Sequence, residues 1–247
     1  MKPHSFAALL FCGCFFQVCH GQQTETQTEP TAATQRPAGL PDGINRSFLD
    51  PEMKVDDFVK RFEVESREVV ACQADILAAI ELKSGMGVAD IGSGTGLYLA
   101  PLSKSVGDSG KVYAVDISPN FVKHLKTRAK DEKLNNVQVI LCNDRETGLK
   151  PNSVDRAFLC DVYHHFEFPE STLKSILTAL RPGGQLILVD FHREIEGERR
   201  EWMMNHIRAP METFKKEIVD AGFKFESEVK IDGFKENYLL RFTKAKH

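Results

Sequence analysis

The stretch that decides the fold runs from Val88 to Gly96 and reads Val-Ala-Asp-Ile-Gly-Ser-Gly-Thr-Gly. Its apolar beginning, Val88–Ile91, is typical of a short buried strand, and a helix-like stretch over 97–105 follows the glycines. Glycines let the backbone turn sharply and bring N–H groups close to a ligand, because no Cβ stands in the way. In a doubly wound sheet, such a strand-to-helix turn binds nucleotide-like ligands.

The chain beyond this stretch alternates short apolar runs with amphipathic segments. Strands are expected over 88–91, 112–115, 137–141, 156–159 and 185–190, and helices over 97–105, 120–133 and 170–180. Strands separated by helices predict right-handed βαβ units and a parallel sheet covered on both faces. After a helix over 211–221, two strands over 223–231 and 237–243 are joined by Asp232-Gly233, so we expect them to pair antiparallel.

Helices are also expected before the sheet. Asp50-Pro51-Glu52 is a typical helix start, with Asp50 as the N-cap and Pro51 in the first turn. Apolar residues then recur at helical spacing, and a second helix is expected over 66–82. The fold class is therefore a doubly wound, Rossmann-like α/β domain preceded by N-terminal helices.

Acidic residues follow the second and third expected strands. Asp116 can accept hydrogen bonds from both hydroxyls of a ribose, and Asp144 is placed to meet an adenine edge. The glycine spacing is Gly-x-Gly-x-Gly, and Leu97 stands where the dinucleotide motif has its third glycine. The spacing therefore disfavours a nicotinamide oxidoreductase, while a nucleotide-binding module without turnover remains an alternative to an enzyme.

Several motifs resemble those of the class I S-adenosylmethionine-dependent methyltransferases. Ala89–Gly96 looks like the family's first motif, Val115–Ser118 like its second, and Leu180–Leu186 like the turn before its fifth strand. Ala221–Phe223 resembles the last helix-to-strand turn. The resemblance implies a seven-stranded sheet of order 3-2-1-4-5-7-6 with strand 7 antiparallel, and S-adenosylmethionine as the cofactor. The loops and tail look closest to the small-molecule and quinone-type branch.

The same resemblance implies where the cofactor binds. Its methionine end is expected near Asp90, Gly92 and Gly94, its ribose at Asp116 and its adenine at Asp144. The full set of expected cofactor-binding residues is Asp90, Gly92, Ser93, Gly94, Thr95, Gly96, Asp116, Ile117, Asp144, Arg145 and Asp161.

The segment Asp161–Phe166 follows the fourth expected strand, and in the resembling enzymes this loop passes the transferable methyl group. His164 or His165 can act as a base near neutral pH, and Tyr163 can orient an acceptor. A base is needed only where the acceptor must lose a proton. Alternatively, one histidine packs under the loop and the other contacts the cofactor.

The acceptor is expected to be a small molecule. A formal net charge of -3 argues against a partner held by a positive field, such as nucleic acid. The Asp/Asn-Pro-Pro-Tyr motif of many nucleobase and amide methyltransferases is missing. Five basic residues on the helix over 120–133 are interrupted by Asp131 and Glu132, which indicates a solvated face. They are Lys123, Lys126, Arg128, Lys130 and Lys133.

Two segments are candidate lids over an acceptor pocket. Residues 61–68 mix aromatic, acidic and basic groups just before the sheet, although a charged helix surface explains them equally well. Residues 194–202 follow the fifth strand. Trp202, Met203 and Met204 can line an apolar acceptor site there, but packing is the favoured interpretation.

The N-terminus predicts export. Phe6–Cys19 is almost wholly apolar, but its fourteen residues rise about 21 Å as a helix, less than a hydrocarbon core of roughly 30 Å. Residues 1–21 are therefore expected to be a signal peptide, with no stable membrane span after its cleavage. An uncleaved anchor and a lipoprotein signal are the alternatives. Residues 22–43 are expected to be a disordered linker, 44–82 a helical lid and 83–247 the cofactor-binding domain.

No metal site is predicted. Cys12, Cys14 and Cys19 lie in the expected signal, so Cys72, Cys142 and Cys160 remain and match no zinc or redox pattern. Cys142 and Cys160 are expected to be buried free thiols. Asn45-Arg46-Ser47 is a formal glycosylation acceptor.

Overall fold

The computed structural model describes Met1, residues 35–65 and residues 67–245. The expected signal peptide beyond Met1 and most of the expected linker therefore lie outside the described residues. Within the described ranges, no helix combines the length and the apolar character needed to cross a bilayer.

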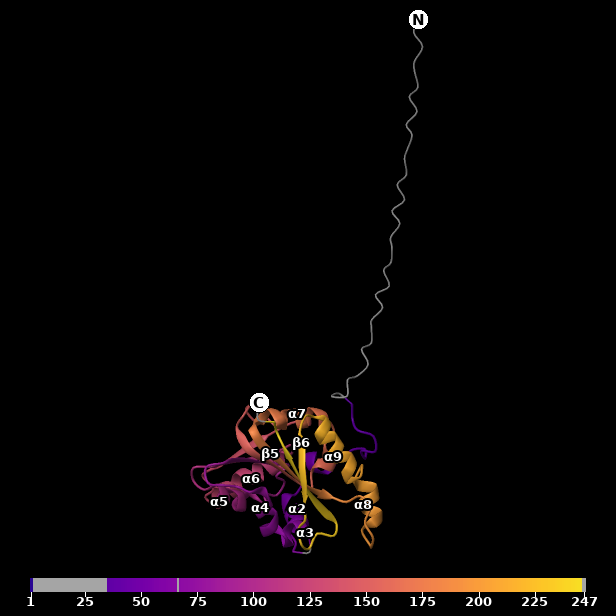
Figure 1. The fold of residues 1–247 in the computed structure, drawn as a ribbon. Coiled ribbons are helices and arrows are strands. Elements are labelled where there is room, and N and C mark those ends of the chain that lie inside the picture. Colours follow the sequence, from indigo (N-terminus) through magenta and orange to yellow (C-terminus); the bar gives the residue numbers. More distant parts are fainter. Residues whose placement is uncertain (2–34, 66, 246–247) are drawn as a thin grey trace.

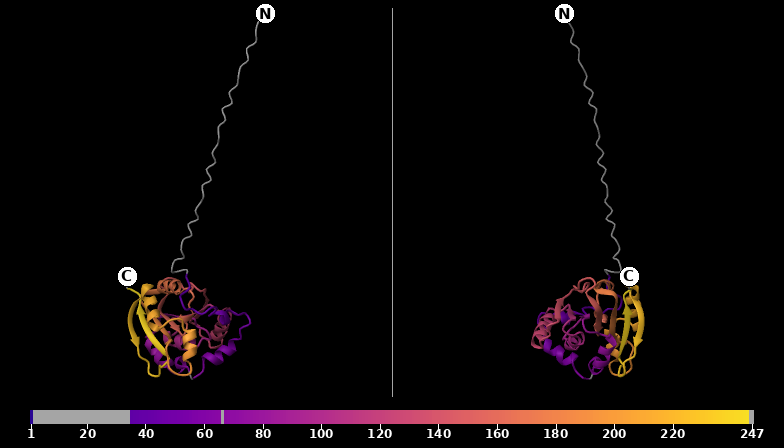
Figure 2. Two further views of the ribbon diagram at one scale, coloured as in Figure 1. Left: turned by 90° about the vertical axis from the view of Figure 1, so that its right-hand side faces the viewer. Right: turned by 60° about the vertical axis from the view of Figure 1, so that its left-hand side comes forward.

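The centre of the domain is a seven-stranded sheet with the order β3-β2-β1-β4-β5-β7-β6, counted over the described residues. The first five strands run parallel, and β7 pairs antiparallel with both β5 and β6 at one side of the molecule (Figure 2). This order confirms the expected fold class and topology. The strands are β1 Gly87–Ile91, β2 Lys111–Asp116, β3 Val137–Leu141, β4 Val154–Cys160, β5 Leu180–Phe191, β6 Lys224–Val229 and β7 Asn237–Thr243.

Helices cover both faces of this sheet (Figure 1). Ala89 of β1 belongs to the same core cluster as Phe214 of α9, whereas its neighbour Val88 belongs to the core that contains Leu102 of α5. Successive side chains of a strand point to opposite faces, so β1 is buried on both faces and is apolar except for Asp90 near its end. After β1 the helical segments are α5 Leu99–Val106, α6 Pro119–Asp131, the 3₁₀ turn η2 Tyr163–His165, α7 Pro169–Ala179, α8 Arg200–His206 and α9 Met211–Asp220.

The N-terminal helices differ from the expectation. They are α1 Arg46–Leu49, α2 Val55–Phe62, α3 Glu68–Ala71 and α4 Gln73–Ile80. Asp50 is not a helix N-cap, because its Oδ1 accepts a hydrogen bond from the Glu52 N–H at 2.8 Å and closes a turn instead. The helix expected over 66–82 is interrupted at Cys72, and it ends at Ile80 because Glu81 adopts a left-handed conformation with φ 55°.

The described end of the expected linker, residues 35–43, lies against the domain, so the expectation of disorder is wrong there. Arg36 Nε lies 3.3 Å from Glu167 Oε2. A Cβ added to Gly39 would come within 2.8 Å of the Arg208 carbonyl oxygen. The glycosylation motif is also excluded as an acceptor, because Asn45 is buried and its Nδ2 donates to the His165 carbonyl and to Glu167 Oε1, both at 3.1 Å.

The cysteines of the described residues are free thiols, as expected, but the expectation that Cys142 and Cys160 are buried is wrong. Cys72 is buried, and Cys142 and Cys160 are partly accessible. Cys160 ends β4, and Cys142 follows β3 directly.

Candidate cofactor and acceptor site

A cavity of about 650 Å³ lies at the carboxyl ends of the parallel strands. Asp90 of β1, Asp116 of β2, Cys160 of β4 and Phe191 of β5 all line it. The chain turns to opposite sides of the sheet from β1 and β4, and this switch point is where open α/β sheets bind their ligands. The volume suits a small organic ligand.

The glycine loop after β1 contains three glycines, and the lack of a side chain serves a different purpose at Gly94 than at Gly92 and Gly96. Gly92 and Gly96 leave room for neighbouring chain: an added Cβ would lie 2.3 Å from Val162 Cγ2 or 2.9 Å from Leu125 Cδ2. Gly94 has φ +53°, yet an added Cβ would find its nearest neighbour 3.9 Å away. Gly94 therefore faces open space in the cavity, which is the cradle that a close-lying ligand needs.

Asp116 fastens this loop to the end of β2. Its Oδ2 accepts from the Gly94 N–H at 2.8 Å, and its Oδ1 accepts from the Ser118 N–H at 2.8 Å. Each carboxylate oxygen keeps a further lone pair for a ligand hydroxyl. Asp116 does not cap the helix that follows, because Ser118 does so through its bond with the Phe121 N–H.

Burial alters the acidity of the carboxyl groups in this part of the cavity. It raises the pKa of Asp116 to about 6, although the N–H groups of Ser118 and Gly94 oppose the rise. It raises the pKa of Asp90 to about 7, and repulsion from Asp116 adds to this rise. Both groups therefore titrate close to neutral pH.

We expect S-adenosylhomocysteine, the demethylated cofactor, to bind about tenfold more tightly at pH 7 than at pH 5, because protonated Asp116 loses acceptor capacity for the ribose. The sign follows from the raised pKa: the free protein holds a proton at pH 5 that binding must displace. Asp90 adds to the slope, and burial raises the pKa of Cys142 to about 12, so this thiol does not titrate in the range. Calorimetry across this range checks the slope, which Asp116→Asn should flatten.

Most of the expected cofactor-binding residues meet in this cavity, and two do not. Gly96 lies outside the lining and contacts α6 instead. Arg145 also lies outside it, because its guanidinium carbon sits 3.4 Å from the centroid of the Phe168 ring. Those that line the cavity are Asp90, Gly92, Ser93, Gly94, Thr95, Asp116, Ile117, Asp144 and Asp161.

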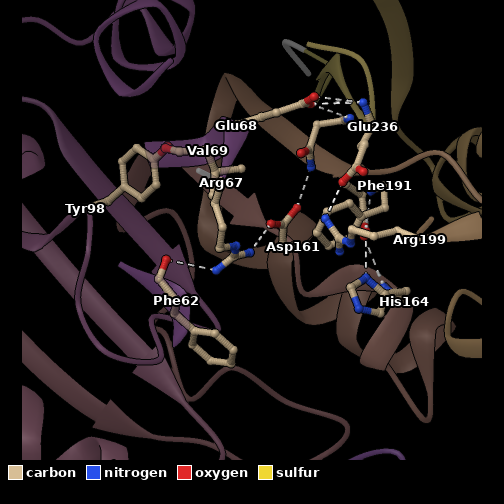
Figure 3. Close-up of polar contacts among 12 residues, drawn as sticks. Phe62, Arg67, Glu68, Val69, Tyr98, Asp161, His164, Phe191, Arg199 and Glu236 are labelled. Atoms are coloured by element: carbon tan, nitrogen blue, oxygen red, sulfur yellow. Dashed lines mark hydrogen bonds and ion pairs between the residues drawn. The ribbon is translucent and has the colours of Figure 1, made fainter. Parts of the chain in front are cut away.

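The last of these, Asp161, ties the N-terminal segment to the end of β4 (Figure 3). Its Oδ2 lies 2.5 Å from Arg67 Nη2, and its Oδ1 accepts from Asn237 Nδ2 at 2.7 Å. Burial raises the pKa of Asp161 to about 7 against the opposing effect of Arg67. The adjacent Glu68 accepts N–H bonds from residues 235–237 just before and at the start of β7, so two neighbouring residues hold this segment over the cavity.

A second tie involves Arg128, for which the interpretation as a solvated helix residue is wrong. Its Nη1 donates to the Thr95 carbonyl at 2.9 Å and to Glu63 Oε1 at 2.7 Å. Arg128 thus joins α6 to the glycine loop and to the residue that ends α2. Its spacing on α6 resembles that of the exposed lysines, so the sequence carried no signal for this role.

The histidines after β4 both line the cavity, together with His206 from the end of α8. His164 is buried, and its Nδ1 lies 2.7 Å from Asp190 Oδ1. Burial lowers the pKa of His164 to about 3 and that of His206 to about 4. Burial favours the neutral form of both imidazoles, whereas the Asp190 carboxylate beside Nδ1 favours proton uptake by His164, so the role of His164 as a base stays a prediction.

The structure contradicts the expected role of Tyr163 in orienting an acceptor. Tyr163 is fully buried outside the cavity lining, and its hydroxyl donates to Glu217 Oε2 at 2.8 Å. Glu217 also pairs with Arg208 through two hydrogen bonds of 2.8 and 2.5 Å. Tyr163 therefore belongs to a polar network in the core between η2 and α9.

Aromatic side chains from the N-terminal helices and α8 also line the cavity and form its aromatic wall. Phe48 of α1 and Phe62 of α2 come from the N-terminal helices, and Trp202 comes from α8. Trp202 stacks on His206 with a centroid distance of 4.4 Å, whereas its neighbour Met203 is fully buried in the core. Packing is thus the correct interpretation for Met203 but not for Trp202.

Comparison with known proteins identifies the same domain. Residues 89–188 match a family described as methyltransferase domain. The ubiquinone/menaquinone biosynthesis C-methyltransferase UbiE of Shewanella frigidimarina is 26% identical over 170 residues, which are 58% of this chain and 68% of that protein.

Solved structures share the fold. A SAM-dependent methyltransferase from Aquifex aeolicus aligns with a TM-score of 0.68 at 26% identity, over 78% of this chain and 100% of that one. The geranyl diphosphate C-methyltransferase of Streptomyces coelicolor, crystallised with S-adenosyl-L-homocysteine, aligns with a TM-score of 0.61 over 85% of this chain and 87% of that one. Its 13% identity shows the fold alone.

The described residues fit the cofactor of these enzymes. Gly94 leaves an open cradle, Asp116 offers carboxylate oxygens at the ribose position, and the cavity continues to Asp144 beyond β3. With the matched domain, the strand order and the glycine loop in agreement, this chain is a class I S-adenosylmethionine-dependent methyltransferase.

Proposed function

We propose that this enzyme methylates a small molecule that binds between the glycine loop and the aromatic wall. One observation carries the proposal: a single cavity is lined both by Gly94 and Asp116 and by the aromatic side chains of Phe48, Phe62 and Trp202. A ligand in the aromatic part therefore lies in the same enclosure as one held by the loop.

The acceptor class that fits best is a hydroxylated aromatic compound of the quinone type. Aromatic walls favour flat rings through stacked and edge-to-face contacts. The relatives named as ubiquinone/menaquinone C-methyltransferases support the same class. Asp90, Ser93 and Asp116 add polar groups to the lining of the same cavity.

The bound cofactor supplies an activated methyl group, so the chain's own task is to align and enclose the acceptor. Alignment of two reactants can supply roughly 7–11 kcal/mol of a barrier. We assign residues 44–82 as the lid, because α1 and α2 carry Phe48 and Phe62 into the cavity wall. The ion pair of Arg67 with Asp161 holds this lid on the sheet.

A screen with radiolabelled S-adenosylmethionine tests the proposal. Reduced quinones and simpler phenols are offered beside an oligonucleotide and a peptide mixture, and extraction into organic solvent separates the products. We expect label in the phenolic acceptors, and Trp202→Ala should raise KM more than it lowers kcat because the residue only contacts the acceptor. Label in the peptide or oligonucleotide, or binding of the cofactor with no transfer, contradicts the proposal.

Export is the second part of the proposal. The apolar run Phe6–Cys19 behind Lys2 is the feature that supports it. We expect a reporter enzyme fused after Gly43 to be exported, and a matched fusion with Leu10→Arg to remain in the cytoplasm because a charge interrupts the run. A wild-type fusion found in the cytoplasm contradicts export.

A further inference from the structure

Three imidazole rings meet in the lining of the cavity. His164 and His165 come from η2 after β4, and His206 is the last residue of α8. One ring nitrogen from each lies within 4.8 Å of the other two. The centroids are 4.3 Å apart for His164–His165 and 5.1 Å apart for each pair with His206. The two elements thus bring three nitrogen donors to one point.

The ring of His164 is held in one orientation by a buried carboxylate. Its Nδ1 lies 2.7 Å from Asp190 Oδ1, and Asp190 itself accepts from the N–H groups of Phe191 at 2.8 Å and His164 at 3.2 Å. When one ring nitrogen donates its N–H to a carboxylate, the other nitrogen keeps a free lone pair. Histidines that bind metals commonly have such a carboxylate partner. On the far side, the ring of Trp202 stacks on His206 with an interplanar angle of 23°.

His165 carries an unsatisfied donor or acceptor. Its Nδ1 is buried and has no hydrogen-bond partner among the described residues. Buried polar atoms without a partner are rare, and each one requires an explanation. Asn45 fixes the backbone of His165 through its carbonyl, so the ring stays beside its two neighbours. A cation shared by the three rings would satisfy this atom.

We propose that His164, His165 and His206 bind one divalent transition-metal ion, with Zn²⁺ as the best fit, and leave a fourth position open to the cavity. Three protein nitrogens with one open position are typical of catalytic zinc. Bonds of about 2.0–2.1 Å in a tetrahedron place the nitrogens about 3.3 Å apart, so the rings turn inward on binding. Asp190 is the hydrogen-bond partner of the His164 ligand on the side away from the ion.

The open coordination position would let this ion bind a hydroxyl group of the acceptor. This role rests on the proposed function, whereas metal binding itself does not. A hydroxyl of the acceptor would bind the ion through its oxygen and release its proton to water, because a metal ion lowers the pKa of a bound hydroxyl. The oxygen anion would donate electron density to the acceptor atom that attacks the methyl group, and the bond between that methyl group and the cofactor sulfur would break to leave S-adenosylhomocysteine.

Metal binding is tested on the full chain without any methyl transfer. The protein is stripped with a chelator, Zn²⁺ is titrated, and bound metal is counted by mass spectrometry; Co²⁺ gives a visible spectrum that reports nitrogen ligands. We expect one ion per chain. His206→Asn should weaken Zn²⁺ binding at least tenfold, and Asp190→Asn should weaken it about 10- to 100-fold as a residue that orients a ligand.

The matched control is His192→Asn, because His192 lies outside this cavity and outside the cluster. It should bind Zn²⁺ as the wild type does. S-adenosylhomocysteine binding by calorimetry reports folding of His206→Asn and separates loss of the metal from loss of the cofactor site. Less than a tenth of an equivalent in the wild type, or equal affinity in wild type and His206→Asn, overturns the proposal.

Discussion

Replacement of Asp116 by alanine is expected to weaken the binding of S-adenosylhomocysteine at least tenfold. The change removes the charged acceptor of the two hydrogen bonds that we expect from the ribose, and such bonds contribute roughly 1.5–3 kcal/mol each. It also removes the acceptor for the Gly94 N–H, which holds the cradle in place. One factor of ten corresponds to about 1.4 kcal/mol, so even one lost bond meets the threshold.

Calorimetry measures this loss, and two further variants interpret it. Asp116→Asn keeps an acceptor oxygen but no charge, so its affinity should fall between those of wild type and Asp116→Ala. Asp108→Ala changes an exposed carboxylate after α5 and should bind as the wild type does. Unchanged affinity in Asp116→Ala would remove the assignment of this cavity end to the cofactor.

Replacement of Glu217 by alanine is expected to lower the free energy of unfolding by about 3 kcal/mol. Loss of one partner from a buried ion pair costs about 3–5 kcal/mol, because the remaining charge has no partner. The Arg208 side chain is only 1% exposed, and the Tyr163 hydroxyl loses its acceptor as well. Glu217 itself is 27% exposed, which places the effect at the lower end of this range.

Urea unfolding followed by circular dichroism gives the comparison with Glu212→Ala. Glu212 lies on the same helix, α9, with its side chain 68% exposed beside Lys215. We expect that control to change the free energy of unfolding by less than about 0.5 kcal/mol. Equal losses in the two variants would mean that the buried network contributes nothing specific.

The sequence predicted the sheet well because its signal is local. Val88–Ile91 is buried on both faces and apolar apart from Asp90, and the glycines after it have positive φ, which a sharp turn requires. The same locality misled the interpretation of Asp50, whose side chain bonds the backbone two residues on and closes a turn instead of starting a helix.

Residues that act through distant partners were beyond the reach of the pattern. Arg67 pairs with Asp161 across 94 positions, and Arg128 reaches the Thr95 carbonyl across 33. Each looks like an ordinary charged helix residue in the sequence. The prediction for Tyr163 was wrong in the opposite sense. Its place in the loop indicated a site residue, but its hydroxyl bonds Glu217, 54 positions away, and the side chain lies in the core.

The sequence by itself thus determined the strand order, through a resemblance, and the edge of the sheet where the cofactor loop and Asp116 lie. Periodicity and turn chemistry act over a few residues and leave a readable pattern. The tertiary structure alone decided which side chains share the cavity: His206 joins His164 and His165 because the end of α8 lies beside η2. Such meetings depend on burial and packing between distant elements, which no local pattern encodes.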